Sequence, residues 1–214
     1  MPALSAIDLA MFMLETRERP FNIGPLVLLH PPAGFKGSFA DKLHARLLKR
    51  PPGPPFNYRL VLSLTHAPSV EPMANPDIRG HVHRLTLQDA SMAQLLEKVC
   101  ELHEAQLDRS GLLWHFYVID GLADGSVALY GKVHHGIIDG RTFVKAVTQW
   151  MSEDPKDKEV RAMWDGVARS AKGAGQRAGM VQRLVAAWSL ENWFSWKNSS
   201  HLPALDSRKF SITW

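Results

Sequence analysis

The chain has 214 residues, of which 45% are hydrophobic and 21% charged, a composition that excludes a disordered chain and permits a domain with a sizeable core. The net charge of +4 is small, and no zinc-finger spacing or basic helix-turn-helix pattern accompanies it, so we expect no nucleic-acid partner. The single cysteine, Cys100, excludes an intrachain disulfide and is expected to pack as a small core residue.

Helix and strand patterns alternate along residues 4–155. Ser5 and Asp8 have the spacing of a capping box, which predicts a short helix over residues 9–14 that ends by Pro20. Apolar periodicity predicts further helices over residues 39–49, 91–107 and 141–151. Apolar runs predict strands over residues 23–30, 58–64, 81–87, 113–119 and 126–133, and a proline-rich loop over residues 50–55.

The last two predicted strands give the clearest hairpin signal, because the turn residues Asp124 and Gly125 lie between them. The second of these strands leads directly into the sequence His-His-Gly-Ile-Ile-Asp-Gly, residues 134–140, and a predicted helix follows. A pair of histidines alone is usually two ordinary core or surface residues. The full seven-residue pattern HHxxxDG between a hairpin and a helix favours a functional site instead.

The residue types in this pattern suit proton transfer better than metal binding. His134 and His135 are neighbours at a strand end, so their side chains should point in opposite directions and make poor partners for one metal ion. We therefore expect no metal site. One imidazole can face a cleft, where its ordinary pKa of about 6.5 suits removal of a proton from a hydroxyl group. Gly140 lies at the strand-to-helix junction, where the missing side chain leaves room for a ligand near the backbone.

A different pattern begins after Pro155. From residue 160 to residue 188 apolar side chains recur every three or four positions, and the opposite face is basic. We expect a basic amphipathic helix here, followed by an irregular tail. Such a helix could lie at an anionic lipid surface.

The sequence contains no signal for membrane crossing. No apolar run approaches the roughly 20 residues needed to span a bilayer. The N-terminal residues lack the positive region and cleavage site of a signal peptide. We therefore expect a cytoplasmic protein, or one peripheral to a membrane.

Several segments together resemble the bacterial wax ester synthase/diacylglycerol acyltransferase family, which belongs to the CoA-dependent acyltransferase superfamily. The HHxxxDG pattern is shared by that whole superfamily, and the flanking sequence is similar to this branch. The segments that carry the resemblance are residues 4–12 and 14–16, the Leu-Asp-Arg-Ser at 107–110, the Leu-Trp at 113–114, and residues 118–122, 132–135 and 151–155. The resemblance covers most of residues 4–155.

The sequence departs from the family pattern in three places. The proline of the family's Pro-Leu-Trp motif is replaced by Leu112, which follows Gly111. The loop after Arg50 is altered. Members of the family also carry a second half that completes the active-site channel, and that half has no counterpart in this sequence.

The resemblance implies an α/β (α+β) fold: one chloramphenicol-acetyltransferase-like lobe with a mixed sheet flanked by helices, plus a C-terminal connector helix. Residues 1–155 would form the N-terminal lobe that carries HHxxxDG. Residues 156–214 would form the basic amphipathic connector helix and the irregular tail, and the second lobe would be absent.

The resemblance also implies the chemistry. Acyl-CoA would be a co-substrate, with no tightly bound cofactor, and the acceptor would be diacylglycerol or a long-chain alcohol. His135 would act as general base, with His134, Asp139 and Gly140 supporting the motif, Asp139 through an ion pair. Leu113, Trp114 and Gly136 would line the substrate channel, although Leu113 and Trp114 fit a strand core equally well.

The implied partners leave alternatives open. A second lobe or a further copy of the chain could complete the site, and the protein could contact a membrane or lipid droplet. A catalytically incomplete half-domain could instead bind lipid or a partner protein. Another branch of the superfamily would depend on a carrier-bound donor instead of free acyl-CoA.

Overall fold

The computed structural model describes residues 4–63, 68–152, 154 and 161–166. Its helices are α1 (Ala6–Leu14), α2 (Phe39–Leu47), α3 (Met92–Glu104) and α4 (Gly140–Trp150), with a short 3-10 turn η1 (His135–Ile137). Its strands are β1 (Asn22–Ile23), β2 (Leu26–Leu29), β3 (Tyr58–Val61), β4 (Ser69–Pro72), β5 (Val82–Thr86), β6 (Trp114–Asp120) and β7 (Val127–His134). In the part of the chain that the structure describes, no helix is both long and apolar enough to cross a membrane.

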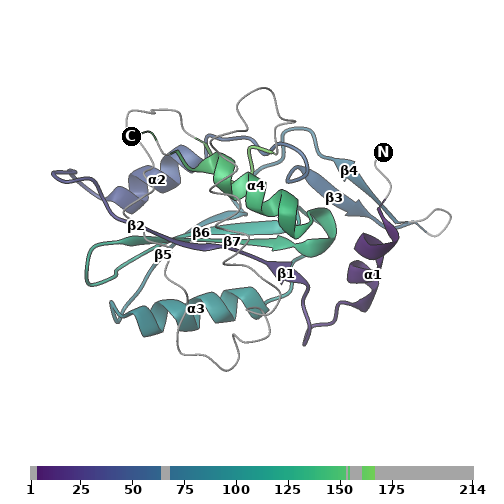
Figure 1. The fold of residues 1–214 in the computed structure, drawn as a ribbon, viewed down its shortest axis with the longest axis horizontal. Helices are drawn as coiled ribbons and strands as arrows, with labels where there is room; N and C mark the ends of the chain where they lie inside the picture. Colours follow the sequence, from purple (N-terminus) through teal and green to yellow (C-terminus); the bar gives the residue numbers. More distant parts are fainter. Residues whose placement is uncertain (1–3, 64–67, 153, 155–160, 167–214) are drawn as a thin grey trace.

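A five-stranded mixed sheet forms the centre of the lobe. Its order is β1-β7-β6-β5, and β2 pairs with β7 in line with β1. β5 and β6 are parallel and are connected through α3, whereas the other pairs are antiparallel. Helices α2 and α4 cover one face of the sheet and α3 covers the other (Figure 1). The predicted mixed sheet flanked by helices is therefore confirmed.

The alternation of side chains along β6 builds a core on each face of the sheet, because successive residues of a strand point to opposite sides. Phe116 and Val118 pack in the core that includes α2 and α4. Tyr117 and Ile119 pack in the second core with Leu95 of α3. Every residue of β7 is buried, so this central strand holds the segment that follows it in a fixed place.

The predicted single strand over residues 23–30 is wrong in one respect, because the structure divides it into β1 and β2. Pro25 has no backbone N–H for the ladder, and its carbonyl instead accepts from the Gly131 N–H at 3.1 Å. A side chain on Gly24 would place its first carbon 2.1 Å from the Gly131 carbonyl oxygen. The break therefore lets the chain approach β7 closely.

A second, two-stranded sheet of β3 and β4 lies beside α1 at one end of the molecule (Figure 1). Phe12 of α1 packs with Leu60, Val70 and Leu113, which joins the helix to this sheet and to the start of β6. The capping box predicted for α1 is present, because the Ser5 hydroxyl accepts from the Asp8 N–H and the Asp8 carboxylate accepts from the Ser5 N–H.

The amphipathic helix predicted over residues 160–188 is wrong for residues 161–166, and the rest of it lies outside the described residues. Residues 161–166 form a turn in which Ala162, Met163 and Trp164 are all buried in the core of the lobe. The Trp164 indole N–H donates to the Arg50 carbonyl at 2.9 Å, and the Gly53 N–H donates to the Trp164 carbonyl at 2.8 Å. These contacts hold the turn against the proline-rich loop, and one face of a helix could not bury three successive side chains.

Candidate active site

The HHxxxDG segment begins at the last residue of β7, passes through η1 and ends at the first residue of α4. β7 lies inside the sheet between β1 and β6, so the segment starts from a central, fully buried strand. The two histidine side chains point apart, as the strand geometry predicted. His134 is turned into the protein toward Glu15, and His135 lines a surface pocket.

The His134 side chain is fully buried. Its Nδ1 accepts from the Gly136 N–H at 2.9 Å, and its ring stacks on Phe12 with 4.1 Å between centroids. Its Nε2 lies 3.5 Å from Oε1 of Glu15. Burial is the main cause that lowers the pKa of His134 to about 4, against the opposing effect of the Glu15 charge. The ring is therefore neutral at pH 7.

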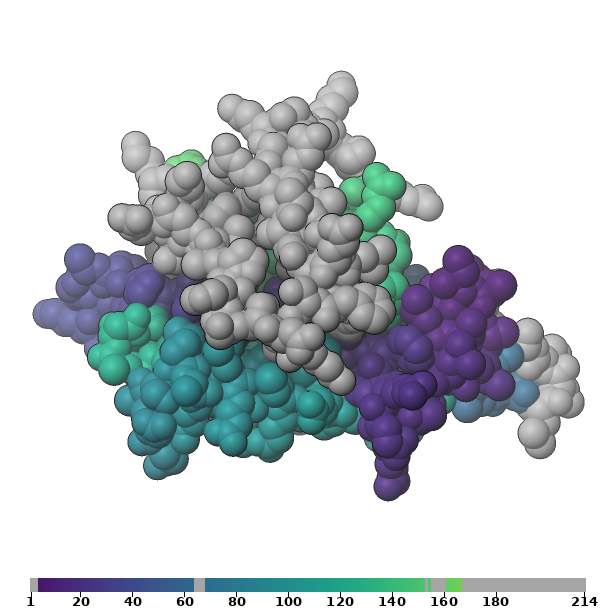
Figure 2. Space-filling view, turned by 60° about the horizontal axis from the view of Figure 1, so that its bottom comes forward, coloured from purple at the N-terminus to yellow at the C-terminus, as the bar shows by residue number. Residues whose placement is uncertain are grey.

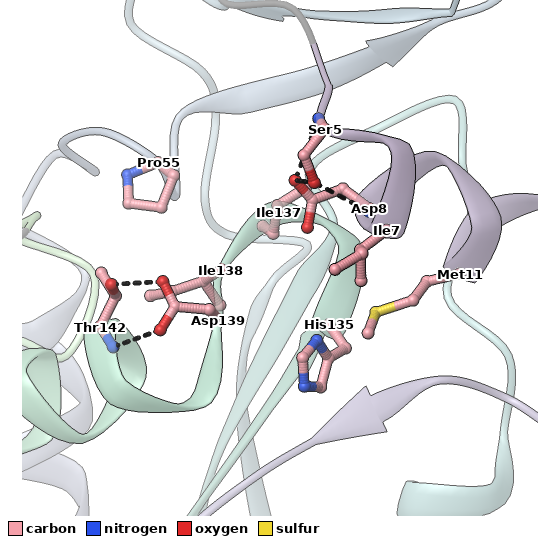
Figure 3. A pocket seen from close by; sticks show the side chains of 10 residues that line it. All are labelled: Ser5, Ile7, Asp8, Met11, Pro55, His135, Ile137, Ile138, Asp139 and Thr142. Atoms are coloured by element: carbon pink, nitrogen blue, oxygen red, sulfur yellow. Dashed lines mark hydrogen bonds between the residues drawn. The ribbon is translucent and has the colours of Figure 1, made fainter.

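His135 is half-buried and faces the pocket between α1, the proline-rich loop and the start of α4 (Figure 3). The other residues that line this pocket are Ser5, Ile7, Asp8, Met11, Pro55, Ile137, Ile138, Asp139 and Thr142. The backbone N–H of His135 donates to the Phe21 carbonyl at 2.8 Å. Among the described residues, its buried ring Nδ1 has no hydrogen-bond partner.

Asp139 caps α4 and makes no ion pair with any described residue, so the ion pair expected for it stays a prediction. Its carboxylate accepts from the Thr142 N–H at 3.0 Å and from the Thr142 hydroxyl at 2.6 Å (Figure 3). Burial acts to raise the pKa of Asp139, but the hydrogen bonds from Thr142 outweigh it and lower the pKa. The carboxylate is therefore charged at neutral pH and satisfies the free N–H groups of the first helical turn.

The predicted channel residues lie behind the pocket instead of on its surface. Leu113 and Trp114 are both fully buried, and the Trp114 indole N–H donates to the Phe56 carbonyl at 2.7 Å. Gly136 is buried against Phe12. A Cβ atom added at Gly136 would lie 2.5 Å from the Phe12 ring. Gly140 is exposed, and no described atom lies within 4 Å of the position that a Cβ atom would take there. Of these four described residues, Gly140 alone leaves open space at the surface, as predicted.

Glu15 contacts His134 of the motif and pairs with Arg109, and neither residue was predicted as a site residue. Glu15 is fully buried, and its Oε2 accepts from Arg109 Nη2 at 2.7 Å and from Gln106 Nε2 at 3.0 Å. Burial acts to raise the pKa of Glu15, but the hydrogen bonds from Arg109, Gln106 and the Phe21 backbone contribute to lowering it overall. Both residues lie in segments that carry the family resemblance, which was the only signal for them in the sequence.

The fold defines the class of protein first. The first condensation domain of the calcium-dependent antibiotic synthetase matches 66% of this chain and 35% of its own length, with a TM-score of 0.50 and 13% sequence identity. At that identity the likeness shows the fold alone, a lobe of the condensation-domain type.

The particular family follows from closer relatives. Residues 4–190 match the wax ester synthase/diacylglycerol acyltransferase catalytic domain, and the chain belongs to this family. The wax ester synthase/diacylglycerol acyltransferase from Marinobacter aquaeolei VT8 is similar over 87% of the chain, with a TM-score of 0.73 and 28% identity. The probable diacylglycerol O-acyltransferases Tgs4 and Tgs2 of Mycobacterium tuberculosis are 33% and 34% identical over 81% and 74% of the chain.

The chain is much shorter than these relatives. It covers 46% of the Marinobacter protein and 36% of Tgs4 and of Tgs2. It corresponds to their N-terminal portion.

Proposed function

We propose that this chain carries the general base of an acyltransferase that moves a fatty acyl group from acyl-CoA to diacylglycerol or to a long-chain alcohol. The products would be triacylglycerol or a wax ester. One observation supports this most directly: His135 faces a pocket in which Ile7, Met11 and Ile138 provide apolar surface, and its Nδ1 has no partner among the described residues. An imidazole beside apolar surface suits an acceptor that combines one hydroxyl with long hydrocarbon chains.

The proposed reaction is direct transfer. The His135 imidazole removes the proton from the acceptor hydroxyl while the oxygen attacks the thioester carbonyl carbon. The tetrahedral intermediate then collapses, the carbon–sulfur bond breaks, and CoA leaves as a thiolate. His135 returns the proton to that thiolate. No acyl-enzyme forms, because the acceptor oxygen attacks the thioester carbon directly. General-base assistance of this kind contributes about 10² to 10⁴ in rate.

The alternative is a half-domain that keeps the motif but only binds lipid or a partner. The surface of α1 favours it, because Ile7, Met13 and Leu14 are 69%, 72% and 66% exposed. Helix α1, which also lines the His135 pocket, lies on the surface at one end of the molecule (Figure 2). These side chains could be covered by a second lobe, by another copy of the chain or by a lipid surface.

The test follows release of the CoA thiol from palmitoyl-CoA in the presence of dioleoylglycerol or hexadecanol. We expect release that depends on the acceptor, and a loss of about 100-fold or more in His135→Ala. The matched control is His30→Ala. His30 is exposed and directly follows β2. The last residue of β2 pairs with the first residue of β7, whereas His134 is the last residue of β7, so the two histidines lie at opposite ends of β7.

Each outcome separates the proposals. Acceptor-dependent release that survives in His30→Ala and is lost in His135→Ala would support the acyltransferase and identify its acceptor class. Equal release by the wild-type protein and His135→Ala would contradict the role of His135. Absence of release, together with binding of either lipid, would favour the half-domain.

A further inference from the structure

One buried carboxylate connects to both histidines of the motif. The Glu15 side chain follows the last turn of α1 and is fully buried. Its Oε2 accepts from three N–H groups, two of Arg109 at 2.7 and 3.1 Å and one of Gln106 at 3.0 Å. Its Oε1 accepts from the Phe21 N–H at 3.1 Å and faces Nε2 of His134. The cationic and amide donors hold one oxygen, and the other oxygen is directed toward the motif.

The first connection passes through the ring of His134. An amide N–H can only donate, so Nδ1 of His134, which accepts from the Gly136 N–H, carries no proton. The proton of the neutral ring must therefore be on Nε2, which makes no hydrogen bond to a described residue and lies 3.5 Å from Oε1 of Glu15. The negative charge of Glu15 favours this tautomer and this ring orientation. The ring in turn holds Gly136, the residue that follows His135 in η1.

The second connection passes through the backbone of Phe21. Its N–H donates to Oε1 of Glu15, and its carbonyl accepts from the His135 N–H at 2.8 Å. The same carboxylate oxygen thus acts on the backbone of His135 from one side and on that of Gly136 from the other. Arg109 also donates to the Phe12 carbonyl at 2.8 Å, which fixes α1 in relation to the loop that precedes β6.

We infer that Glu15 is a positioning residue for His135: its charge orients the ring of His134 and its Oε1 binds the backbone of Phe21, and these two groups fix the turn that presents His135 to the pocket. Glu15 touches no substrate in this scheme. The inference rests on the proposed function only where it concerns catalysis, because the tautomer of His134 is a property of the folded chain.

The variant that tests the inference is Glu15→Gln, which keeps the size of the side chain. A carboxylate accepts through both oxygens, whereas an amide has one oxygen and two donor hydrogens. Glutamine must therefore direct its NH₂ group either at the donors of Arg109 and Gln106 or at those of His134 and Phe21. The matched control is Asp120→Asn, because Asp120 also pairs with an arginine, Arg84, but lies at the opposite end of the β6–β7 hairpin from His134.

The first measurement is the ¹⁵N spectrum of the histidine rings at pH 7, with the His134 signals assigned by comparison with His134→Gln. In the wild-type protein we expect an unprotonated Nδ1 and a protonated Nε2. In Glu15→Gln we expect a fraction of the Nδ1-protonated tautomer, in molecules whose ring has turned away from the Gly136 N–H, and in Asp120→Asn the wild-type pattern. A wild-type His134 that is protonated on Nδ1 would overturn the inference, whether or not Glu15→Gln folds.

The second measurement is the kinetics of thioester cleavage. Displacement of a catalytic group by about 1 Å can cost on the order of 100-fold in rate, so we expect kcat to fall about 10- to 100-fold in Glu15→Gln with a small change in KM for acyl-CoA. Asp120→Asn should keep the wild-type kcat. A Glu15→Gln protein with wild-type kcat and wild-type tautomer would contradict the positioning role. A chain without activity whose His134 tautomer still changes in Glu15→Gln would support that role and count against the proposed function alone.

Discussion

Gly136 and Gly140 belong to the same motif but meet different surroundings. Replacing Gly136 with alanine would push a carbon to 2.5 Å from the Phe12 ring, so we expect a loss of about 1–3 kcal/mol in the free energy of unfolding. At Gly140, no described atom lies within 4 Å of the position of an added Cβ atom, and the residue begins α4. We therefore expect Gly140→Ala to raise the free energy of unfolding by about 0.4–1 kcal/mol. Urea denaturation of Gly136→Ala and Gly140→Ala would measure both.

The same pair of variants bears on ligand approach. If acyl-CoA passes close to the backbone at Gly140, the stable Gly140→Ala protein should still have a raised KM for acyl-CoA. A Gly140→Ala protein with wild-type KM would mean that the open space there is not used. A Gly136→Ala protein as stable as the wild type would contradict the close packing of Phe12 on the motif.

At the scale of residues, the sequence predicted chemistry that is local and missed chemistry that is not. His135 could be proposed as a site residue because its motif occupies seven consecutive positions that follow a recognisable hairpin. Glu15 could not, because its partner Arg109 lies 94 positions further along the chain. No periodicity or spacing rule relates two such residues, and only the packing of α1 against the loop before β6 brings them together.

At the scale of elements, Asp139 shows how one side chain can serve a helix. It accepts from both the N–H and the hydroxyl of Thr142 at the start of α4. Asparagine caps helices about as well as aspartate, whereas alanine costs about 0.5–2 kcal/mol. We therefore expect Asp139→Asn to keep the melting temperature and most of the activity, and Asp139→Ala to lower both.

Thermal unfolding and the thioester assay would separate this cap from the alternatives. An ion pair or a proton-transfer role would require the charge of Asp139, so asparagine would then be as damaging as alanine. Loss of activity in Asp139→Asn with an unchanged melting temperature would indicate a role in the reaction that the cap does not explain.

The elements themselves were predicted where a strong periodic pattern exists. Helices α2, α3 and α4 and strands β5, β6 and β7 all lie where residue patterns placed them, within a few residues at each end. β4 was missed, because Ser69–Pro72 offers only one buried side chain and ends in a proline. The break between β1 and β2 was missed because Gly24 and Pro25 interrupt an otherwise continuous apolar run.

At the scale of the whole molecule, the boundary placed after residue 155 remains a prediction, but the core of the lobe extends beyond it. Trp164 is fully buried and stacks on Trp114 with 5.0 Å between ring centroids. Asp165 accepts from both Nε and Nη2 of Arg50 at 3.1 and 2.9 Å. The periodic pattern from residue 160 onward suggested a helix outside the lobe, because periodicity cannot reveal that a tryptophan fills a site beside β6.

The contribution of this turn can be measured by shortening the chain. A chain that ends after residue 154 would expose the Trp114 ring, whereas one that ends after residue 166 keeps Trp164 in place. Removal of a buried tryptophan side chain costs roughly 3–5 kcal/mol, so we expect the shorter chain to be less stable than the longer one by at least this amount. Trp164→Ala in the full chain should lower the free energy of unfolding by about the same amount. Urea denaturation followed by tryptophan fluorescence would compare all three with the wild-type protein. Equal stability of the two shortened chains would show that residues 161–166 only rest on a lobe that is complete without them, and the lobe would then end where the sequence placed its boundary.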